Sequence, residues 1–248
     1  MYHLLAWSED VVTATQTDLQ PVVDPIIPVV NNHFMPSEDM SAYWALAFGT
    51  NLQTMQVSTP KLVQVAPPYI RPIQGSLIGV SDQNECWMDR VPMRFRGQEE
   101  IVLYATQNAG ANQQITALMA LGTRLVAVPP GDIYRVRATS TTAAVANTWT
   151  QITYTLGNQL PAGRYAVVLV EWIAANAQAV RATFDDQYYR PGGPGMPTAL
   201  SRVPYQWTDY SLGVWGYFYT YSLPRLEVLA NGTPNSHELY FHVIKMAA

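Results

Sequence analysis

GRYAVVLVEWIAANAQAVRATF, residues 163–184, is the stretch of the sequence that decides the fold. Its first part, Tyr165–Ile173, is a run of β-branched and aromatic residues, which is typical of a buried strand. A small polar cluster, Ala174–Gln178, interrupts this run. The last part, Ala179–Phe184, alternates apolar and polar residues, as a half-buried strand does. The stretch therefore predicts a β-hairpin at the core of a β-sandwich.

A second block of the chain has the same plan. Glu100–Leu121 contains an apolar strand, a turn rich in Ala, Asn and Gln, and a return strand. The likeness indicates an internal repeat, and the alternative is that any two β-hairpins look alike at this level. Val128–Gly131, with two consecutive prolines, lies between the blocks and is the best linker candidate. We therefore predict a first domain at residues 1–127, which includes an extended N-terminal arm, and a second at residues 128–248.

The rest of the chain reads as short strands separated by turns. The four prolines of residues 16–36 exclude a helix or a central strand and indicate an extended segment. A helix is predicted at Met40–Phe48, because Ser37 can cap it and Gly49 can end it; the alternative is a strand through Tyr43–Phe48. Residues 185–213 are predicted to be a long loop. Strands that recur about every 8–12 residues are typical of a sandwich or barrel.

Composition limits the classes of function. Charged residues make up only 13% of the chain, about half the usual share, and Lys61 and Lys245 are the only lysines. A surface with few charges and many tyrosines suits a protein that is covered by neighbouring copies of itself. The net charge of −4 gives no general attraction to nucleic acid. No stretch has the length of apolar residues that a membrane span needs, and the single Cys86 favours folding inside the cell.

The usual catalytic motifs are missing from the sequence. Cys86 has acidic neighbours, which oppose thiolate formation, and the spacing of His237 and His242 places them on opposite faces of a strand rather than on one helical face. No cofactor is expected. Calcium can bind clusters of carboxylates, so a structural calcium ion is considered at Asp185–Asp186 or in the acidic loop, with solvated acids as the alternative. The loop acids are Asp82, Glu85 and Asp89.

An aromatic cluster near the C-terminus is the sharpest feature. Its members are Tyr205, Trp207, Tyr210, Trp215, Tyr217, Phe218, Tyr219 and Tyr221. Alternate residues of a strand share one face, and each buried Tyr hydroxyl needs a partner, so a plain core face is the less favoured alternative. We predict an interface with a neighbouring subunit, formed by Trp207, Trp215, Tyr217, Tyr219 and Tyr221. A sugar-stacking platform is the other functional alternative.

The chain resembles the jelly-roll coat proteins of tailless icosahedral viruses, in particular the small double-jelly-roll type. The resemblance rests on the Pro-rich segment 21–36, the run KLVQVAPPYIRPI at Lys61–Ile73, the two strand–turn–strand blocks on either side of Val128–Gly131, and the lysine-poor, aromatic character of the chain. It implies an all-β fold of two side-by-side jelly rolls, and homotrimers that tile an icosahedral shell. With the helix predicted at Met40–Phe48, the expected fold is two jelly rolls with one short helix. A single jelly roll with long loops is the alternative.

The leading hypothesis is therefore a viral major capsid protein that self-assembles and is not an enzyme. The resemblance implies a place in the virion after folding in the host cytoplasm, copies of itself as partners, and minor capsid proteins and an internal membrane as further partners. Sequence-specific nucleic-acid binding is not expected. One alternative is a carbohydrate-binding β-sandwich module that uses Trp207, Trp215 and nearby tyrosines as stacking surfaces.

A second alternative is a hydrolase with Asp185, Asp186 or Glu171 as its acids. Glu171 lies in the middle of a strand, where burial would raise its pKa. The competing interpretation, which we favour, is that Glu171 and Arg181 face solvent or a neighbouring subunit.

Overall fold

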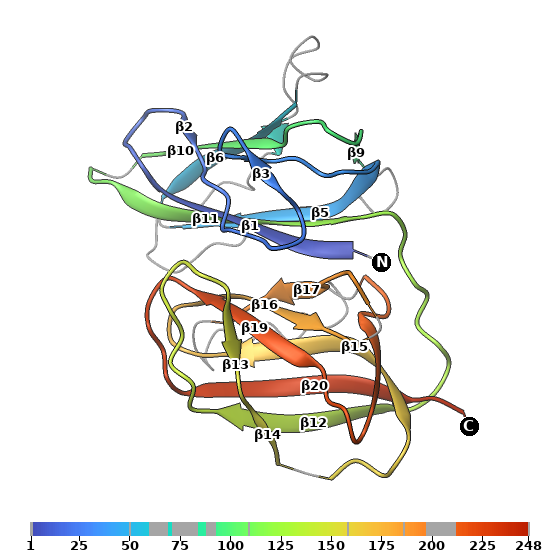
Figure 1. Ribbon diagram of the computed structural model, residues 1–248. Helices are drawn as coiled ribbons and strands as arrows, with labels where there is room; N and C mark the ends of the chain where they lie inside the picture. The colour runs from blue at the N-terminus through green and yellow to red at the C-terminus, as the bar shows by residue number, and fades with distance from the viewer. Residues whose placement is uncertain are drawn as a thin grey trace. The chain divides into compact units, whose positions relative to one another are not determined.

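The computed structural model is built from β-strands (Figure 1). It describes residues 2–49, 51–59, 69–70, 84–87, 93–108, 110–157, 159–185, 187–196 and 212–247, without the side chains of 48, 69–70 and 84–87. These residues contain no helix, and therefore none that could span a membrane. They divide into two compact units, an N-terminal unit of Leu5–Thr123 and a C-terminal unit of Arg124–Ala248 together with Met1–Leu4.

The N-terminal unit has two main sheets. The first has the order β1 (Tyr2–Val11), β11 (Gln113–Gly122), β5 (Met40–Phe48) and β8 (Asn84–Trp87), with β9 (Met93–Phe95) also paired to β5. The second has the order β2 (Thr17–Asp18), β10 (Val102–Gln107), β6 (Leu52–Ser58) and β7 (Tyr69–Ile70). The short pair β3 (Val29–Val30) and β4 (His33–Phe34) lies outside both sheets. The core of the unit is apolar and includes an edge-to-face contact between Trp7 and Phe34.

The C-terminal unit also has two sheets. The first has the order β14 (Thr155–Leu156), β12 (Ile133–Ser140), β20 (His237–Lys245), β15 (Arg164–Ile173) and β18 (Gly216–Tyr219). The second has the order β13 (Thr150–Ile152), β19 (Arg225–Ala230), β16 (Ala177–Thr183) and β17 (Gly192–Pro194).

Both units have the same strand order. If the eight main strands of each unit are numbered along the chain, without β3, β4, β9 and β14, one sheet has the order 1-8-3-6 and the other 2-7-4-5. This is the jelly-roll arrangement, in which two antiparallel sheets pack face to face and the chain crosses between them. The predicted all-β jelly-roll fold is confirmed, and the chain contains the jelly roll twice.

The decisive stretch 163–184 folds into strands, but the strands do not form a hairpin. β15 pairs with β18 and β20, whereas β16 pairs with β17 and β19 in the other sheet. The chain turns between them at Asn176, which has a positive φ of 58°, a conformation that Asn tolerates better than most residues. The predicted hairpin is wrong, because nearly complete burial of both strands says nothing about whether they pair or face each other.

The internal repeat between the two blocks is also wrong. β10 and β11 are the seventh and eighth main strands of their unit, whereas β15 and β16 are the third and fourth of theirs. The counterparts of β15 and β16 in the N-terminal unit are β5 and β6. The two units therefore share an order of strands rather than the sequence plan of those blocks.

The helix predicted at Met40–Phe48 is strand β5 instead. It pairs with β11 on one side and with β8 and β9 on the other, and residues 42–47 are all buried. A short apolar run that is buried on both faces cannot be distinguished from a buried helix by its periodicity. The carboxylate of Asp39 accepts a hydrogen bond from the backbone N–H of Gly97 at 2.8 Å rather than serving a helix start.

The region predicted as a long loop contains the strand β17. Its first residue, Gly192, lies so close to β16 that a Cβ atom there would lie 2.4 Å from the carbonyl oxygen of Val180. Glycine is the residue that permits such an approach between backbones. The composition Pro-Gly-Gly-Pro, which indicates a turn in most sequences, here forms an edge strand.

Candidate functional site

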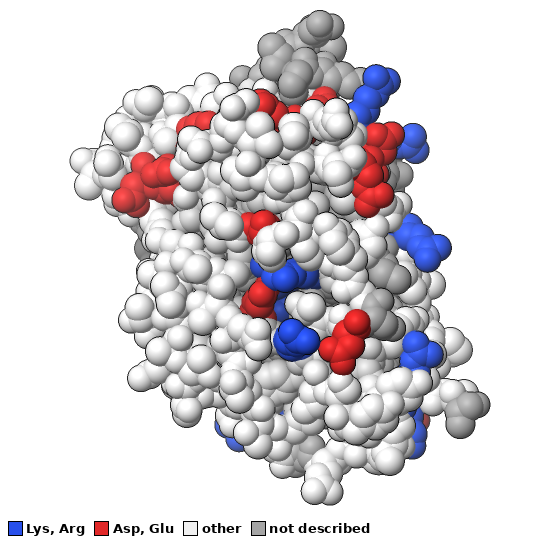
Figure 2. All heavy atoms as spheres, in the orientation of Figure 1, with Lys and Arg blue, Asp and Glu red and all other residues white. Residues whose placement is uncertain are grey.

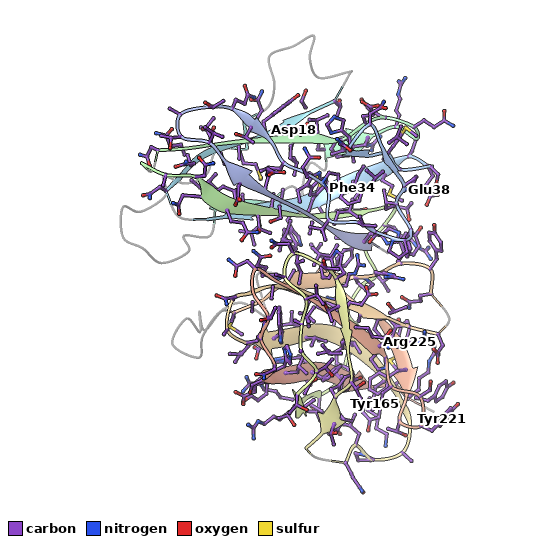
Figure 3. The ribbon with its side chains drawn as sticks, turned by 60° about the vertical axis from the view of Figure 1, so that its left-hand side comes forward. Asp18, Phe34, Glu38, Tyr165, Tyr221 and Arg225 are labelled. Atoms are coloured by element: carbon purple, nitrogen blue, oxygen red, sulfur yellow. The ribbon has the colours of Figure 1, made fainter. Side chains whose placement is uncertain are left out.

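The aromatic residues of the predicted interface take different positions in the C-terminal unit. Trp207 lies outside the described residues. Trp215 is only 1% exposed and is enclosed within the unit. Tyr217 is half-buried, whereas Tyr219 is 44% and Tyr221 is 83% exposed. Figure 3 shows Tyr221 at the periphery of the unit and Tyr165 inside it. Two of the five predicted residues are therefore exposed, and that the cluster contacts another subunit stays a prediction.

Strand β18 presents its tyrosines beside an arginine of β15. Arg164 pairs with Tyr219 in the antiparallel register, and Ala166 pairs with Tyr217, so these side chains share one face of the sheet. The guanidinium carbon of Arg164 lies 4.7 Å from the centre of the Tyr217 ring and 5.9 Å from that of Tyr219. Cation–π attraction at these distances holds the arginine against the rings.

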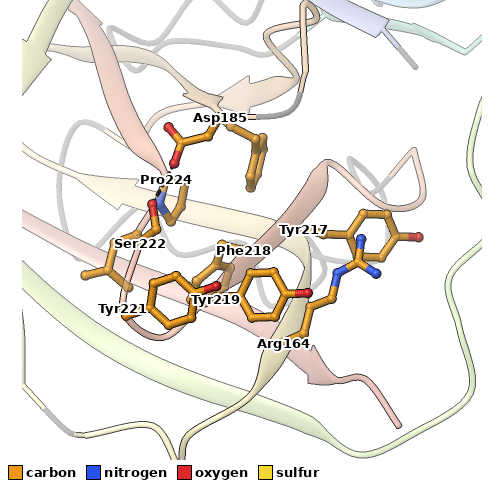
Figure 4. Close-up of a pocket in the computed structure, with 10 residues that line it drawn as sticks. Arg164, Asp185, Tyr217, Phe218, Tyr219, Tyr221, Ser222 and Pro224 are labelled. Carbon is orange, nitrogen blue, oxygen red and sulfur yellow. Dashed lines mark hydrogen bonds between the residues drawn. The ribbon is translucent and has the colours of Figure 1, made fainter. Parts of the chain in front are cut away.

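The turn after β18 brings a third tyrosine to the same place. The backbone N–H of Ser222 donates to the carbonyl of Tyr219 at 2.8 Å, and that of Thr220 donates to Gly163 at 3.1 Å. These bonds fix the turn, and the rings of Tyr219 and Tyr221 lie nearly parallel, with an angle of 14° and centres 5.2 Å apart. Figure 4 shows both rings beside each other with their faces turned the same way.

A carboxylate stands at the other end of this cluster. The hydroxyl of Ser222 donates to Oδ2 of Asp185 at 2.6 Å (Figure 4). The guanidinium of Arg225 is 3.8 Å from Oδ1 of Asp185, and both of these side chains are exposed. The neighbouring Phe184 packs on the backbone of Gly216, where a Cβ atom would lie 2.4 Å from the ring. Glycine at position 216 therefore lets β18 approach the end of β16.

These groups enclose a cavity of about 260 Å³. Its lining is mostly aromatic and apolar, with a cation and a carboxylate as its charged groups. The lining residues are Arg164, Phe184, Asp185, Tyr217, Phe218, Tyr219, Tyr221, Ser222, Leu223 and Pro224. A concave aromatic surface with a few fixed polar groups is the usual form of a small-molecule site.

Glu171 lies elsewhere on the same unit. Its carboxylate accepts a hydrogen bond from Arg135 at 2.7 Å and is 3.2 Å from Nε2 of His242. Burial raises the pKa of Glu171, but hydrogen bonds from His242 and Arg135, together with their electrostatic attraction, outweigh burial and leave the pKa below its ordinary value. The prediction that burial gives Glu171 the raised pKa of a catalytic acid is therefore wrong.

Arg181 does not face solvent, contrary to the prediction. Its side chain is 0% exposed, and its Nε donates to Glu227 at 2.6 Å. Arg190 donates to the same carboxylate at 2.8 Å, and the Trp149 ring lies 4.0 Å from the Arg181 guanidinium. This contact could not be predicted from the sequence, because only the pairing of β16 with β17 and β19 brings Arg181, Arg190 and Glu227 together.

The two histidines of the predicted C-terminal pair have different surroundings in the described part of the chain. Nδ1 of His237 accepts a hydrogen bond from Trp172 at 3.1 Å inside the unit, whereas His242 faces Glu171. Within the described ranges, no three His, Cys, Asp or Glu side chains gather as metal ligands would. Asp186 and two acids of the predicted acidic loop, Asp82 and Asp89, lie outside the described residues, as do the side chains of Cys86 and Glu85.

Comparison with known proteins gives distant likenesses. No protein-family model and no curated protein matches the chain. Among solved structures, the major capsid protein P2 of bacteriophage PM2 is matched at 9% identity over 100% of this chain and 98% of the other, with a TM-score of 0.26. Sulfolobus turreted icosahedral virus is matched at 9% identity over 100% and 81%, with a TM-score of 0.23.

A third solved structure, described as the triple jelly roll fold and turret assembly of an archaeal virus, is matched at 9% identity over 98% of this chain and 79% of the other, with a TM-score of 0.23. Scores this low do not establish a family. The strand order of this chain shows by itself that the chain carries two jelly rolls of identical strand order.

Proposed function

We propose that this chain is the major capsid protein of a tailless icosahedral virus, a structural protein without enzymatic activity. The observation that carries the proposal is the tandem jelly roll, two units with sheets ordered 1-8-3-6 and 2-7-4-5 in one chain. Jelly rolls also occur in lectins and cupins. The tandem arrangement favours the capsid protein, because it is the architecture that the sequence resemblance implies.

The surface is consistent with burial between copies. Only 13% of the residues are charged, and on the face drawn in Figure 2 the charged side chains form small, separate groups in a largely uncharged surface. Contact surfaces between subunits are depleted of lysine and glutamate at their centres. We propose that copies associate as homotrimers that tile a shell in the virion, with minor capsid proteins and an internal membrane as further partners.

The test is the size of the particles formed by the purified chain. Light scattering after size-exclusion chromatography is expected to show a trimer or a larger species, and negative-stain micrographs are expected to show rings or shells at high concentration. A stable monomer at every concentration, without rings or shells, would contradict the proposal.

A further inference from the structure

We infer that the tyrosine-lined cavity beside β18 binds a neutral saccharide ring. This goes beyond the proposed capsid role and does not depend on it, because the cavity is formed by one C-terminal unit alone. With a volume of about 260 Å³, it lies near the lower end of ligand sites, which begin at about 300 Å³. That size suits one sugar ring rather than a folded partner.

The aromatic groups match one side of a sugar. A pyranose ring has a face of C–H groups that carry partial positive charge, and the face of an aromatic ring is negative. Tyr219 and Tyr221 are stacked at 14° to each other with their faces turned the same way (Figure 4), so a sugar can stack on the ring face that the pair leaves uncovered. Both rings are exposed in the chain, and stacking a sugar on them removes apolar surface from water.

The polar groups match the rim of a sugar. Hydroxyls both donate and accept hydrogen bonds, and the cavity offers a carboxylate acceptor in Asp185 and a guanidinium donor in Arg164. Oδ2 of Asp185 is held in place by Ser222. Among the described residues, the guanidinium of Arg164 contacts ring faces, so its N–H donors are available to a ligand.

The site is assembled before a ligand arrives. The turn that carries Tyr221 is closed by a backbone bond from Ser222 to Tyr219, and Arg164 is held against Tyr217. Groups that are already ordered lose little conformational entropy on binding.

The experiment titrates the full chain with the methyl glycosides of glucose, galactose, mannose and N-acetylglucosamine, followed by calorimetry and by ligand-observed NMR. We expect at least one to bind with a dissociation constant of about 1 mM. Tyr219→Ala and Tyr221→Ala are each expected to weaken that binding about tenfold, and Asp185→Asn to weaken it severalfold. Tyr188→Ala is the matched control, since Tyr188 is an exposed tyrosine that does not line the cavity.

Circular dichroism of each variant checks that it folds. Failure of all four glycosides to bind overturns the inference, as does binding that survives the double variant Y219A/Y221A. Adenine that binds as well as the glycosides would show a general stacking site and also overturns it. If the double variant changes particle size but not glycoside binding, the tyrosines form a subunit contact instead. Particle size is measured separately, so the capsid proposal and the saccharide site can fail independently.

Discussion

Arg181 shows how a single charged residue can belong to the interior of a sandwich. Its guanidinium is enclosed, and the carboxylate of Glu227 compensates both it and Arg190. Removing one partner of a buried ion pair leaves an uncompensated charge away from water, which costs far more than the pair itself contributes. Glu227 therefore links β19 to both Arg181 of β16 and Arg190.

We predict that Glu227→Gln lowers the free energy of unfolding by about 3–5 kcal/mol, measured by urea denaturation. The matched control is Glu238→Gln, since Glu238 pairs with Arg137 at 2.9 Å where both side chains are partly exposed. Such pairs contribute about 1 kcal/mol or less. Equal losses in the two variants would show that the Arg181 cluster is solvated.

The lowered pKa of Glu171 makes the stability of the fold depend on pH. Its folded pKa lies below its ordinary value, so its contribution to stability is complete above the unfolded pKa and is lost as the pH falls through the folded pKa. The variant Glu171→Gln should lose less stability than the parent chain between neutral pH and about pH 3. Unfolding midpoints in urea across this range measure the difference. Parallel pH profiles would show that the carboxylate is not paired with Arg135 and His242.

At the scale of elements, β17 depends on one glycine. A Cβ atom at Gly192 would lie 2.4 Å from the carbonyl oxygen of Val180, whereas one at Gly193 would meet the Trp215 ring at 3.6 Å, an ordinary contact. Gly192→Ala is therefore expected to cost about 1–3 kcal/mol, with a lower midpoint of thermal unfolding. Gly193→Ala, next to it in the same strand, should change the midpoint little. The reverse order would show that β17 is not paired as described.

Sequence patterns located strands better than they located pairings. The two strands of residues 163–184 and the turn between them were predictable, because burial and β-branching mark them locally. Their assignment to opposite sheets depends on partners such as β18 and β20, which lie far away in the sequence. The prediction of a helix at Met40–Phe48 was wrong, because pairing with β11, β8 and β9, and not the periodicity of the segment itself, makes it a central strand.

The candidate site likewise contains residues that the sequence places together and residues that only the tertiary structure brings together. Tyr217 and Tyr219 share one face of β18, as their spacing predicts, and Tyr221 joins them through a turn. Arg164 was not found from the sequence, and Asp185 was considered there only as a calcium ligand or a catalytic acid, because both reach the tyrosines only through the β15–β18 register and the approach of Phe184 to Gly216. The charged residues that give the cavity its chemistry are therefore the ones that tertiary structure supplies.

At the scale of the whole molecule, the first residues belong with the last half of the chain. The Tyr2 hydroxyl donates to the carbonyl of Gly192 at 3.0 Å, and the N–H of Leu4 donates to that of Arg190 at 2.9 Å. The ring of His3 lies 4.8 Å from that of Tyr189. The C-terminal unit is thus complete only when Tyr2–Leu4 are in place.

We predict that Tyr2→Phe lowers the stability of the C-terminal unit by about 1 kcal/mol, the usual contribution of one hydrogen bond. Hydrogen–deuterium exchange followed by mass spectrometry should show faster exchange in peptides that cover Arg190–Pro194, with little change in β6 and β10. Faster exchange confined to the N-terminal unit would contradict this placement of Tyr2.

The contacts of Tyr2–Leu4 can form only late in the synthesis of the chain. A ribosome makes Tyr2–Leu4 early, but their partners at Arg190 and Gly192 emerge only after most of the chain has been translated. The N-terminal jelly roll can fold before Tyr2–Leu4 reach their partners in the C-terminal unit, since domains fold as they leave the ribosome. A nascent chain that stops before Arg190 therefore leaves Tyr2 and Leu4 without the backbone acceptors that they bind in the folded C-terminal unit.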